Sequence, residues 1–190
     1  FLKIQRSQAR NKPLIRVSAG DLHRVVDVAE RELATRGHHF QSGGLIVSIS
    51  TDPTSGDPSI IPTTISALTR ELSIAADWEK LTIRYGLVQT DPPPRHVTVL
   101  HDAQKFAHLP PLAGLARQPY FSEVDRQLIT EPGYSPSTHR FGVFNAQHFF
   151  VTEPSHKATR DALGLLEGLL SEFHFVSVAD KAAALSAIFT

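Results

Sequence analysis

Apolar residues recur every three or four positions between Asp21 and Gly37, and this spacing predicts an amphipathic helix. Asp21 stands at the expected N-cap, and Gly37 is the residue at which the helix should end. A second helix is expected to begin with Ser66 as its N-cap, and its apolar positions are Leu68, Leu72, Ala75 and Trp78. A third helix should follow the prolines at 92–94 and end before Pro110, with apolar positions Val97, Leu100, Ala103 and Phe106.

The C-terminal part of the chain predicts two more helices. The first covers 158–173 and carries a wide apolar stripe. The second begins with a capping box made by Ser177 and Asp180 and is still running at Thr190. Because the chain ends in mid-helix, begins with Phe and contains no Met, we expect it to be a piece of a longer protein.

The segments between these helices have β character. A hairpin is expected over 40–49, because Gly43 and Gly44 separate two apolar runs and can supply its turn. A polar loop should follow over 51–59. Further strands are expected over 60–65 and 81–88, and short strands separated by turns over 112–144. The predicted fold class is α+β, since strands and helices alternate too irregularly for a doubly wound parallel sheet.

These elements divide the sequence into three regions. Residues 1–16 form a basic arm or linker, and residues 17–150 form the α+β domain. Residues 151–190 form a C-terminal helical segment that is expected to lead to a missing domain.

Composition narrows the class of protein. Hydrophobic residues make up 41% of the chain and charged residues 20%, which is typical of a globular protein. No apolar run approaches the roughly 20 residues needed to span a bilayer. The absence of cysteine excludes disulfide and thiolate chemistry and fits a cytoplasmic location. No Walker-type phosphate loop and no other cofactor motif occurs, so we expect no cofactor.

The net charge is zero, but the charges are distributed unevenly. Residues 1–50 carry eight Lys or Arg against four acids. Arg10, Lys12 and Arg16 belong to this basic N-terminal part, which either contacts nucleic-acid phosphates or is a solvated linker.

Basic residues also alternate with aromatic residues in the strand-rich segment. The members of this pattern are Arg117, Tyr120, Arg126 and Arg140. Guanidinium groups beside aromatic rings can hold phosphates and stack bases, although the same pattern arises when strand residues simply alternate between core and solvent. Glu123 and Asp125 indicate a different kind of site. Together with a histidine from elsewhere they could bind a metal for nucleotidyl transfer, or they could form a solvated loop.

A set of short motifs resembles a known family. It consists of Pro92-Pro93-Pro94, Leu109-Pro110-Pro111-Leu112-Ala113-Gly114, Gln118-Pro119-Tyr120-Phe121, Pro132-Gly133-Tyr134-Ser135-Pro136-Ser137-Thr138 and the ending Leu169-Leu170-Ser171-Glu172-Phe173-His174-Phe175. These motifs resemble the stretch that precedes the P-loop ATPase in phage and prophage primase-helicase-like replication proteins. The resemblance spans residues 13–190. It implies a neighbouring P-loop ATPase domain C-terminal to this chain and a role in DNA replication.

Three functions are therefore weighed. The first is a non-catalytic accessory module that binds or positions DNA, with single-stranded DNA as one candidate form, for a mobile-element helicase-primase. The second is a structural oligomerisation collar, which would pack an apolar helix face against a neighbouring subunit or the ATPase. Its interface residues would be Leu165, Leu166, Leu169 and Leu170. The third is the metal-dependent nucleotidyl-transfer enzyme described above.

Overall fold

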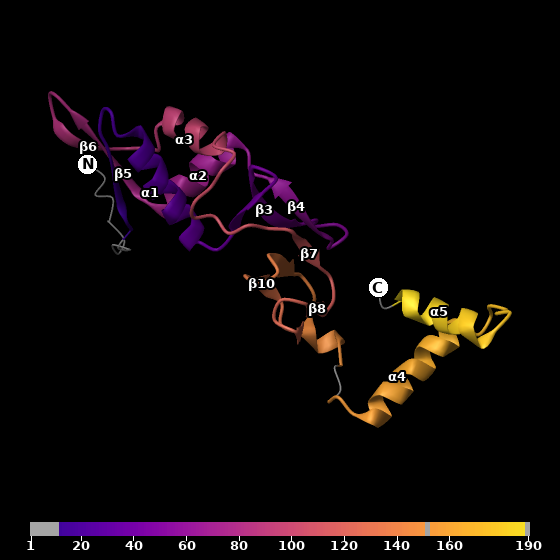
Figure 1. The fold of residues 1–190 in the computed structure, drawn as a ribbon. Coiled ribbons are helices and arrows are strands. Elements are labelled where there is room, and N and C mark those ends of the chain that lie inside the picture. Colours follow the sequence, from indigo (N-terminus) through magenta and orange to yellow (C-terminus); the bar gives the residue numbers. More distant parts are fainter. Residues whose placement is uncertain (1–11, 151–152, 189–190) are drawn as a thin grey trace. The chain divides into compact units, whose positions relative to one another are not determined.

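The computed structural model describes residues 12–150 and 153–188, and the chain is an α+β protein (Figure 1). It divides into two compact units, Phe1–Ala146 and Gln147–Thr190. In the described part of the chain, no helix has the length and the apolar character needed to cross a membrane.

Unit 1 begins with a three-stranded sheet. Strand β1 (Leu14–Val17) pairs in parallel with β5 (Asp77–Thr82), and β5 pairs in antiparallel fashion with β6 (Gly86–Thr90). The sequence segment predicted to be a basic arm therefore ends in a strand. These four residues form a strand because buried and exposed positions alternate: Ile15 and Val17 are buried, while their neighbours face solvent.

Three helices form the main core with this sheet. They are α1 (Leu22–Thr35), α2 (Ile65–Ala75) and α3 (Pro94–His101), which pack on one another, while α1 also packs on β1 and α2 on β5. The largest fully buried side chains of this core are Trp78, Leu33, Leu68, Leu72, Leu100 and Leu109. The predicted helix between Asp21 and Gly37 is confirmed. Asp21 makes no side-chain capping bond, however, and its carboxylate instead lies 3.7 Å from the Arg24 guanidinium.

A second sheet is an antiparallel meander of β2 (His39–Ser42), β3 (Leu45–Thr51) and β4 (Pro58–Pro62). The predicted hairpin is confirmed: Gly43 and Gly44 form its turn with φ angles of 57° and 79°, which side chains with a Cβ rarely adopt.

The short strands expected over 112–144 are also confirmed. They are β7 (Gly114–Ala116), β8 (Tyr120–Ser122), β9 (Gln127–Ile129), β10 (Gly133–Ser135) and β11 (Arg140–Gly142). Strands β10, β11 and β7 form one small sheet, and β8 and β9 form a hairpin. We call residues 114–142 the β7–β11 group. It packs on the second sheet, since Tyr134 and Phe141 contact a small core of Phe40, Val47 and Leu112.

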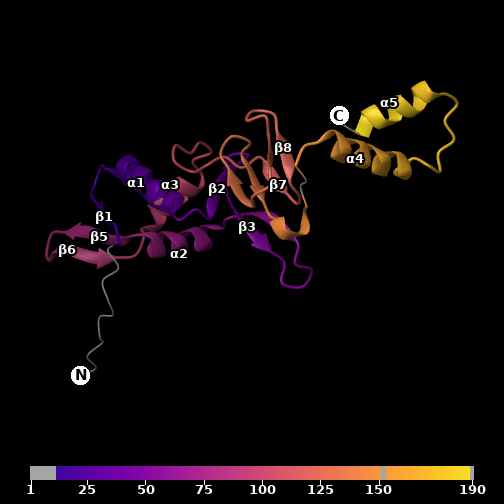
Figure 2. The same ribbon diagram turned by 90° about the horizontal axis from the view of Figure 1, so that it is seen from below.

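The β7–β11 group and the β5–β6 hairpin lie toward opposite ends of unit 1 (Figure 1 and Figure 2). The helices and the β2–β3–β4 sheet lie between them.

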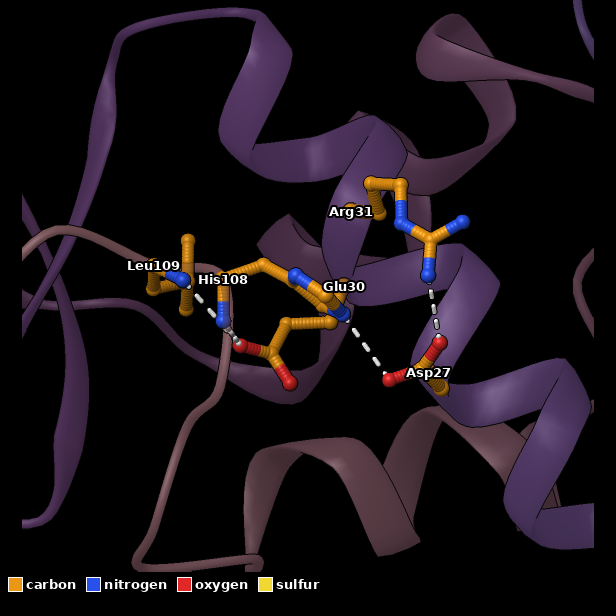
Figure 3. A network of polar contacts seen from close by, with 5 residues as sticks. All are labelled: Asp27, Glu30, Arg31, His108 and Leu109. Carbon is orange, nitrogen blue, oxygen red and sulfur yellow. Dashed lines mark hydrogen bonds and ion pairs between the residues drawn. The ribbon is translucent and has the colours of Figure 1, made fainter.

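A carboxylate on α1 fastens the segment that leads from α3 into the β7–β11 group (Figure 3). Glu30 is only 6% exposed, and its Oε1 accepts hydrogen bonds from the backbone N–H groups of His108, at 2.5 Å, and Leu109, at 3.1 Å. The His108 ring Nε2 lies 2.8 Å from Oδ1 of Asp27, and Arg31 donates to Oδ2 of the same carboxylate. Hydrogen bonding to His108 is the largest cause that holds the pKa of Asp27 below the ordinary value.

Unit 2 contains the helices α4 (His156–Leu169) and α5 (Val178–Ile188). A short 3-10 helix, η1 (Ala146–His148), precedes them and begins at the last residue of unit 1. Ser155 caps α4 by accepting from the Ala158 N–H, and the Ser177 hydroxyl accepts from the Asp180 N–H at the start of α5. An ion pair of 3.4 Å between Lys181 and Glu167 links the two helices. The expectation that the last helix runs through Thr190 falls partly outside the described residues.

Two details of the second predicted helix are wrong. Thr64, and not Ser66, is the N-cap, because its Oγ1 accepts from the Ala67 N–H at 3.2 Å. Trp78 lies in β5 because the backbone becomes extended at Ala76. The Trp78 ring then folds back under the helix end, where Nε1 donates to the Leu72 carbonyl at 3.2 Å. In the sequence, Trp78 therefore has the spacing of the next apolar residue of the helix, although it is a buried strand residue.

The third predicted helix is too long. It ends at His101, with Asp102 as C-cap, and Gln104 adopts a left-handed conformation with φ of 58° that no helix can continue through. Phe106 is nevertheless buried in the main core, and it reaches that core from an irregular segment.

Candidate nucleic-acid interface

Four of the residues singled out in the sequence lie in the β7–β11 group. Arg117 follows β7, Tyr120 begins β8, Arg126 lies in the β8–β9 turn, and Arg140 begins β11. Lys12 and Arg16 lie elsewhere, just before and within β1. Arg10 is outside the described residues.

Hydrogen bonds between turns hold the β7–β11 group together. The Asp125 carboxylate accepts from the hydroxyl groups of Ser122 and Ser137, so the β8–β9 turn is tied to the β10–β11 turn. These two hydroxyl groups, Ser137 first, hold the pKa of Asp125 below its ordinary value. The Tyr120 hydroxyl lies 2.8 Å from Oγ1 of Thr138 and adds a second tie between the hairpin and the same turn.

Arg140 and Tyr120 form a cation–π pair on this scaffold. The Cζ atom of Arg140 lies 5.6 Å from the centroid of the Tyr120 ring, within the range of an attractive interaction. Arg126 is exposed and has a left-handed φ of 51°. It lines a shallow depression together with Phe121, whose side chain is 60% exposed, and with Glu123. Within residues 12–150 and 153–188, neither Arg126 nor Arg140 takes part in an ion pair.

The other predicted basic residues already have partners. Nη1 of Arg117 lies 3.1 Å from the Asp57 carboxylate of the β3–β4 loop. Nε of Arg16 lies 3.4 Å from the carboxylate of Glu79 in the neighbouring strand. Lys12 donates to the Ser73 carbonyl at 3.5 Å. Among the predicted cations that the structure describes, Arg126 and Arg140 are therefore the most available to a polyanion.

The carboxylates considered for metal binding do not converge on one point. Asp125 is occupied by the two serine hydroxyls, and Glu123 is exposed. Across the described parts of the chain, no group of three His, Asp or Glu side chains is arranged as metal ligands would be. The arrangement assigns Asp125 a role in fastening turns together.

A second basic and aromatic site was missed in the sequence. At the tip of the β5–β6 hairpin, Cζ of Arg84 lies 5.4 Å from the Tyr85 ring centroid, and the Tyr85 side chain is 71% exposed. The tip is shaped by Thr82, whose Oγ1 accepts from the Tyr85 N–H and donates to the Gly86 carbonyl. The signal that could have revealed it is the Arg-Tyr-Gly sequence between two β-type runs, where a glycine turn leaves an aromatic residue in solvent.

The proposed interface leucines of unit 2 lie on or beside α4. Leu165 and Leu169 are 76% and 72% exposed, whereas Leu166 and Leu170 are half-buried. No residue of α4 or α5 that the structure describes is buried. Two of the four proposed interface leucines are thus mostly exposed, and their role in an interface stays a prediction.

No protein family, no curated protein and no solved structure matches the chain. The resemblance to the pre-ATPase stretch of phage primase-helicase-like proteins therefore stays a prediction, and the functional argument depends on the geometry described above.

Proposed function

We propose that this chain is an accessory nucleic-acid-binding module of a mobile-element helicase-primase, cytoplasmic and without catalysis of its own. It would position DNA, preferably a single strand, for a P-loop ATPase domain C-terminal to it. The β7–β11 group would make the main contact. The resemblance noted in the sequence motivates the replication context.

The Arg140–Tyr120 pair carries the proposal. A ring that holds a guanidinium group on one face offers both an electrostatic contact to phosphate and an aromatic platform, the combination that sequence-tolerant single-strand binders use. Arg126 and the exposed Phe121 add a second cation and a second aromatic side chain, which line one shallow depression together with Glu123. The ties made by Asp125 and Thr138 hold the two turns and the Tyr120 ring in place before any ligand binds, so the ring needs little further ordering on binding.

The test is fluorescence anisotropy with a labelled single-stranded oligodeoxynucleotide of about 20 nucleotides, longer than one typical single-strand binding site. The combined substitution of Arg126→Gln and Arg140→Gln is expected to weaken binding by roughly 10- to 30-fold, taking about 1 kcal/mol for each exposed charge contact. The matched control is Arg24→Gln with Arg31→Gln on α1, which removes the same charge from surface ion pairs elsewhere. Equal weakening by both double variants would mean that only net charge matters, and the proposed surface would be wrong.

Tyr120 separates stacking from charge. Tyr120→Phe keeps the ring and should bind nearly as well as the natural protein, whereas Tyr120→Leu should weaken single-strand binding by roughly five- to tenfold, since stacking contributes about 1–3 kcal/mol for each base. Both variants lose the hydroxyl contact with Thr138, so any difference between them reports the ring itself.

A second candidate function, self-association, is favoured by two exposed leucines of α4. Leu165 and Leu169 lie four positions apart on the helix and are both mostly exposed, as expected when two copies pack through this stripe. Light scattering after size exclusion tests it. An oligomer that becomes monomeric with Leu165→Gln and Leu169→Gln, but not with Arg160→Gln on the same helix, supports the collar. A monomer at all concentrations contradicts it.

A further inference from the structure

The β5–β6 hairpin exposes several apolar and aromatic side chains close together. Leu81 and Leu87 face each other across the two strands and are 62% and 49% exposed. At the tip, the Ile83 side chain is fully exposed, and Tyr85 carries the Arg84 guanidinium over its ring. Single exposed apolar residues are ordinary, but a group of them on one projecting element indicates contact with another molecule.

The charge of the hairpin indicates what kind of molecule this is. Within residues 12–150 and 153–188, neither Lys80, Arg84 nor Arg95 takes part in an ion pair. The stretch from Lys80 to Thr90 contains no acidic residue, and the carboxylate of Glu79, just before it, is already held in an ion pair of 3.4 Å. The hairpin therefore favours an anionic partner.

A cavity of about 380 Å³ lies beside the hairpin. Lys80 and Arg95 both line it, and no acidic residue does. Its other lining residues come from the hairpin, from β1 and the start of α1, and from the start of α3, and Val17, Leu22 and Pro93 among them are apolar. The hairpin, β1 and the start of α1 lie together at one end of unit 1 (Figure 1 and Figure 2). A ligand that fits therefore combines negative charge with an apolar surface, as a nucleotide unit does through its phosphate, sugar and base.

The exposed tip and the cavity together match a single nucleic-acid strand better than a lipid surface or a duplex. An exposed ring can stack on an unpaired base, and a phosphate on a flexible backbone can enter a hollow lined by cations. A bilayer would meet the apolar tip, but it cannot follow the protein surface from the tip into the cavity. The bases of a duplex are already stacked on one another.

We propose that the β5–β6 hairpin and this cavity form a second contact for single-stranded nucleic acid. Tyr85, with Arg84 on its ring, would stack on a base, and Lys80 and Arg95 would hold a neighbouring phosphate. The choice of ligand rests on the proposed function, but the hairpin contact shares no residue with the β7–β11 group and lies toward the opposite end of unit 1.

Photocrosslinking distinguishes the two contacts, because the chain contains three tyrosines in different places. The full chain is irradiated with a single-stranded oligodeoxynucleotide of about 20 nucleotides that carries 5-bromodeoxyuridine, which crosslinks to aromatic side chains stacked on it. Mass spectrometry then identifies the modified peptides. A crosslink at Tyr85 is expected. Tyr134, whose ring packs on Phe40 in the small core, is the internal control and should not crosslink.

The outcomes for the two proposals are separable. Crosslinks at both Tyr85 and Tyr120 support both contacts. A crosslink at Tyr120 alone leaves the proposed function standing and overturns the second contact, whereas a crosslink at Tyr85 alone does the reverse. No crosslink at either tyrosine overturns both.

The cavity is tested by fluorescence anisotropy in the protein that already carries the two glutamine substitutions of the β7–β11 group, so that the first contact does not mask the second. Adding Lys80→Gln and Arg95→Gln should weaken strand binding about tenfold and reduce the crosslink at Tyr85. The matched control adds Arg24→Gln and Arg31→Gln, which remove the same charge from ion pairs outside the cavity. Equal weakening by the two additions would overturn the cavity contact.

The tip is tested in the same protein. Tyr85→Phe keeps the ring and should bind nearly as well, whereas Tyr85→Leu should weaken binding about fivefold. Both variants keep the turn, because Thr82 bonds to backbone groups of residues 85 and 86. A duplex of equal length that competes as well as the single strand would overturn stacking on a base.

Sedimentation with vesicles of phosphatidylcholine and phosphatidylserine tests the membrane alternative. The natural protein is expected to remain in solution. Vesicle binding that Tyr85→Leu abolishes, together with strand binding that Tyr85→Leu leaves unchanged, would assign the tip to a lipid surface and overturn the proposal.

Discussion

Replacing Glu30 should reveal how strongly one buried carboxylate fastens the two halves of unit 1. Its Oε1 accepts from the N–H groups of His108 and Leu109, and the residue is 6% exposed. Glu30→Ala leaves both donors without a partner, at a cost of about 1–3 kcal/mol each. The expected loss in the free energy of unfolding is therefore about 2–6 kcal/mol, a large share of the 5–15 kcal/mol typical of a domain.

Glu30→Gln keeps an oxygen that can accept both bonds but removes the charge. Since hydrogen bonds to charged groups are roughly twice as strong as neutral ones, the expected loss is only about 1 kcal/mol. Glu32→Ala on the same helix serves as a control, because its side chain makes no hydrogen bond or ion pair in the described residues, and its effect should stay within about 0.5 kcal/mol.

The assay is urea unfolding followed by the fluorescence of Trp78, the one tryptophan in the chain. Trp78 is 2% exposed in the main core, so its signal reports unit 1 and is not mixed with the unfolding of unit 2. If Glu30→Ala and Glu32→Ala destabilise equally, Glu30 does not fasten the segment at His108 and Leu109 that Figure 3 shows.

Three further predictions concern the stability of the same unit. Thr64→Ala removes the cap of α2 and should cost about 1 kcal/mol in urea unfolding, while Thr64→Ser should cost much less. Thr63→Val removes a buried hydroxyl without a partner and should raise the free energy of unfolding by about 1 kcal/mol, whereas a loss would show that the hydroxyl is satisfied. The pKa of His39 is lowered by burial in the folded state, so as the pH drops below about 6.5 the unfolded chain binds a proton before the folded chain does. The free energy of unfolding therefore decreases as the pH is lowered. His39→Gln should reduce this fall between pH 7.5 and 5.5, and an unchanged profile would assign it to other groups.

Local patterns predicted much of the fold because local chemistry determines those elements. The helix ending near Gly37 follows from a continuous apolar stripe, and the β2–β3 hairpin follows from two glycines that accept positive φ. The α+β class and the short strands of the β7–β11 group follow in the same way from turn residues.

The errors occurred where distant contacts override a local pattern. Trp78 continues the stripe of α2 in sequence, yet it is a strand residue because β5 is held between β1 and β6. Phe106 continues the stripe of α3, yet the chain leaves the helix at Asp102 and returns to the core without helical structure. Strand β1 escaped notice because its partner lies more than 60 residues away.

The candidate site also combines residues that local patterns predict with contacts that only the fold determines. Composition and spacing suggested Arg126, Arg140 and Tyr120, but only the contacts between the β8–β9 hairpin and the β10–β11 turn bring the Arg140 guanidinium over the Tyr120 ring. Sequence also suggested Arg16 and Arg117, whose ion pairs with Glu79 and Asp57 depend on contacts that no local pattern contains.

The salt dependence of single-strand binding tests most directly whether Arg126 and Arg140 hold phosphates. Each phosphate contact contributes about 0.7 to the slope of log affinity against log salt concentration for a single strand. The double glutamine variant should therefore have a slope shallower by about 1.4, while the control variant at Arg24 and Arg31 keeps the natural slope. Equal slopes for all three proteins, or no binding by the natural protein at about 50 mM salt, would contradict a nucleic-acid interface on the β7–β11 group.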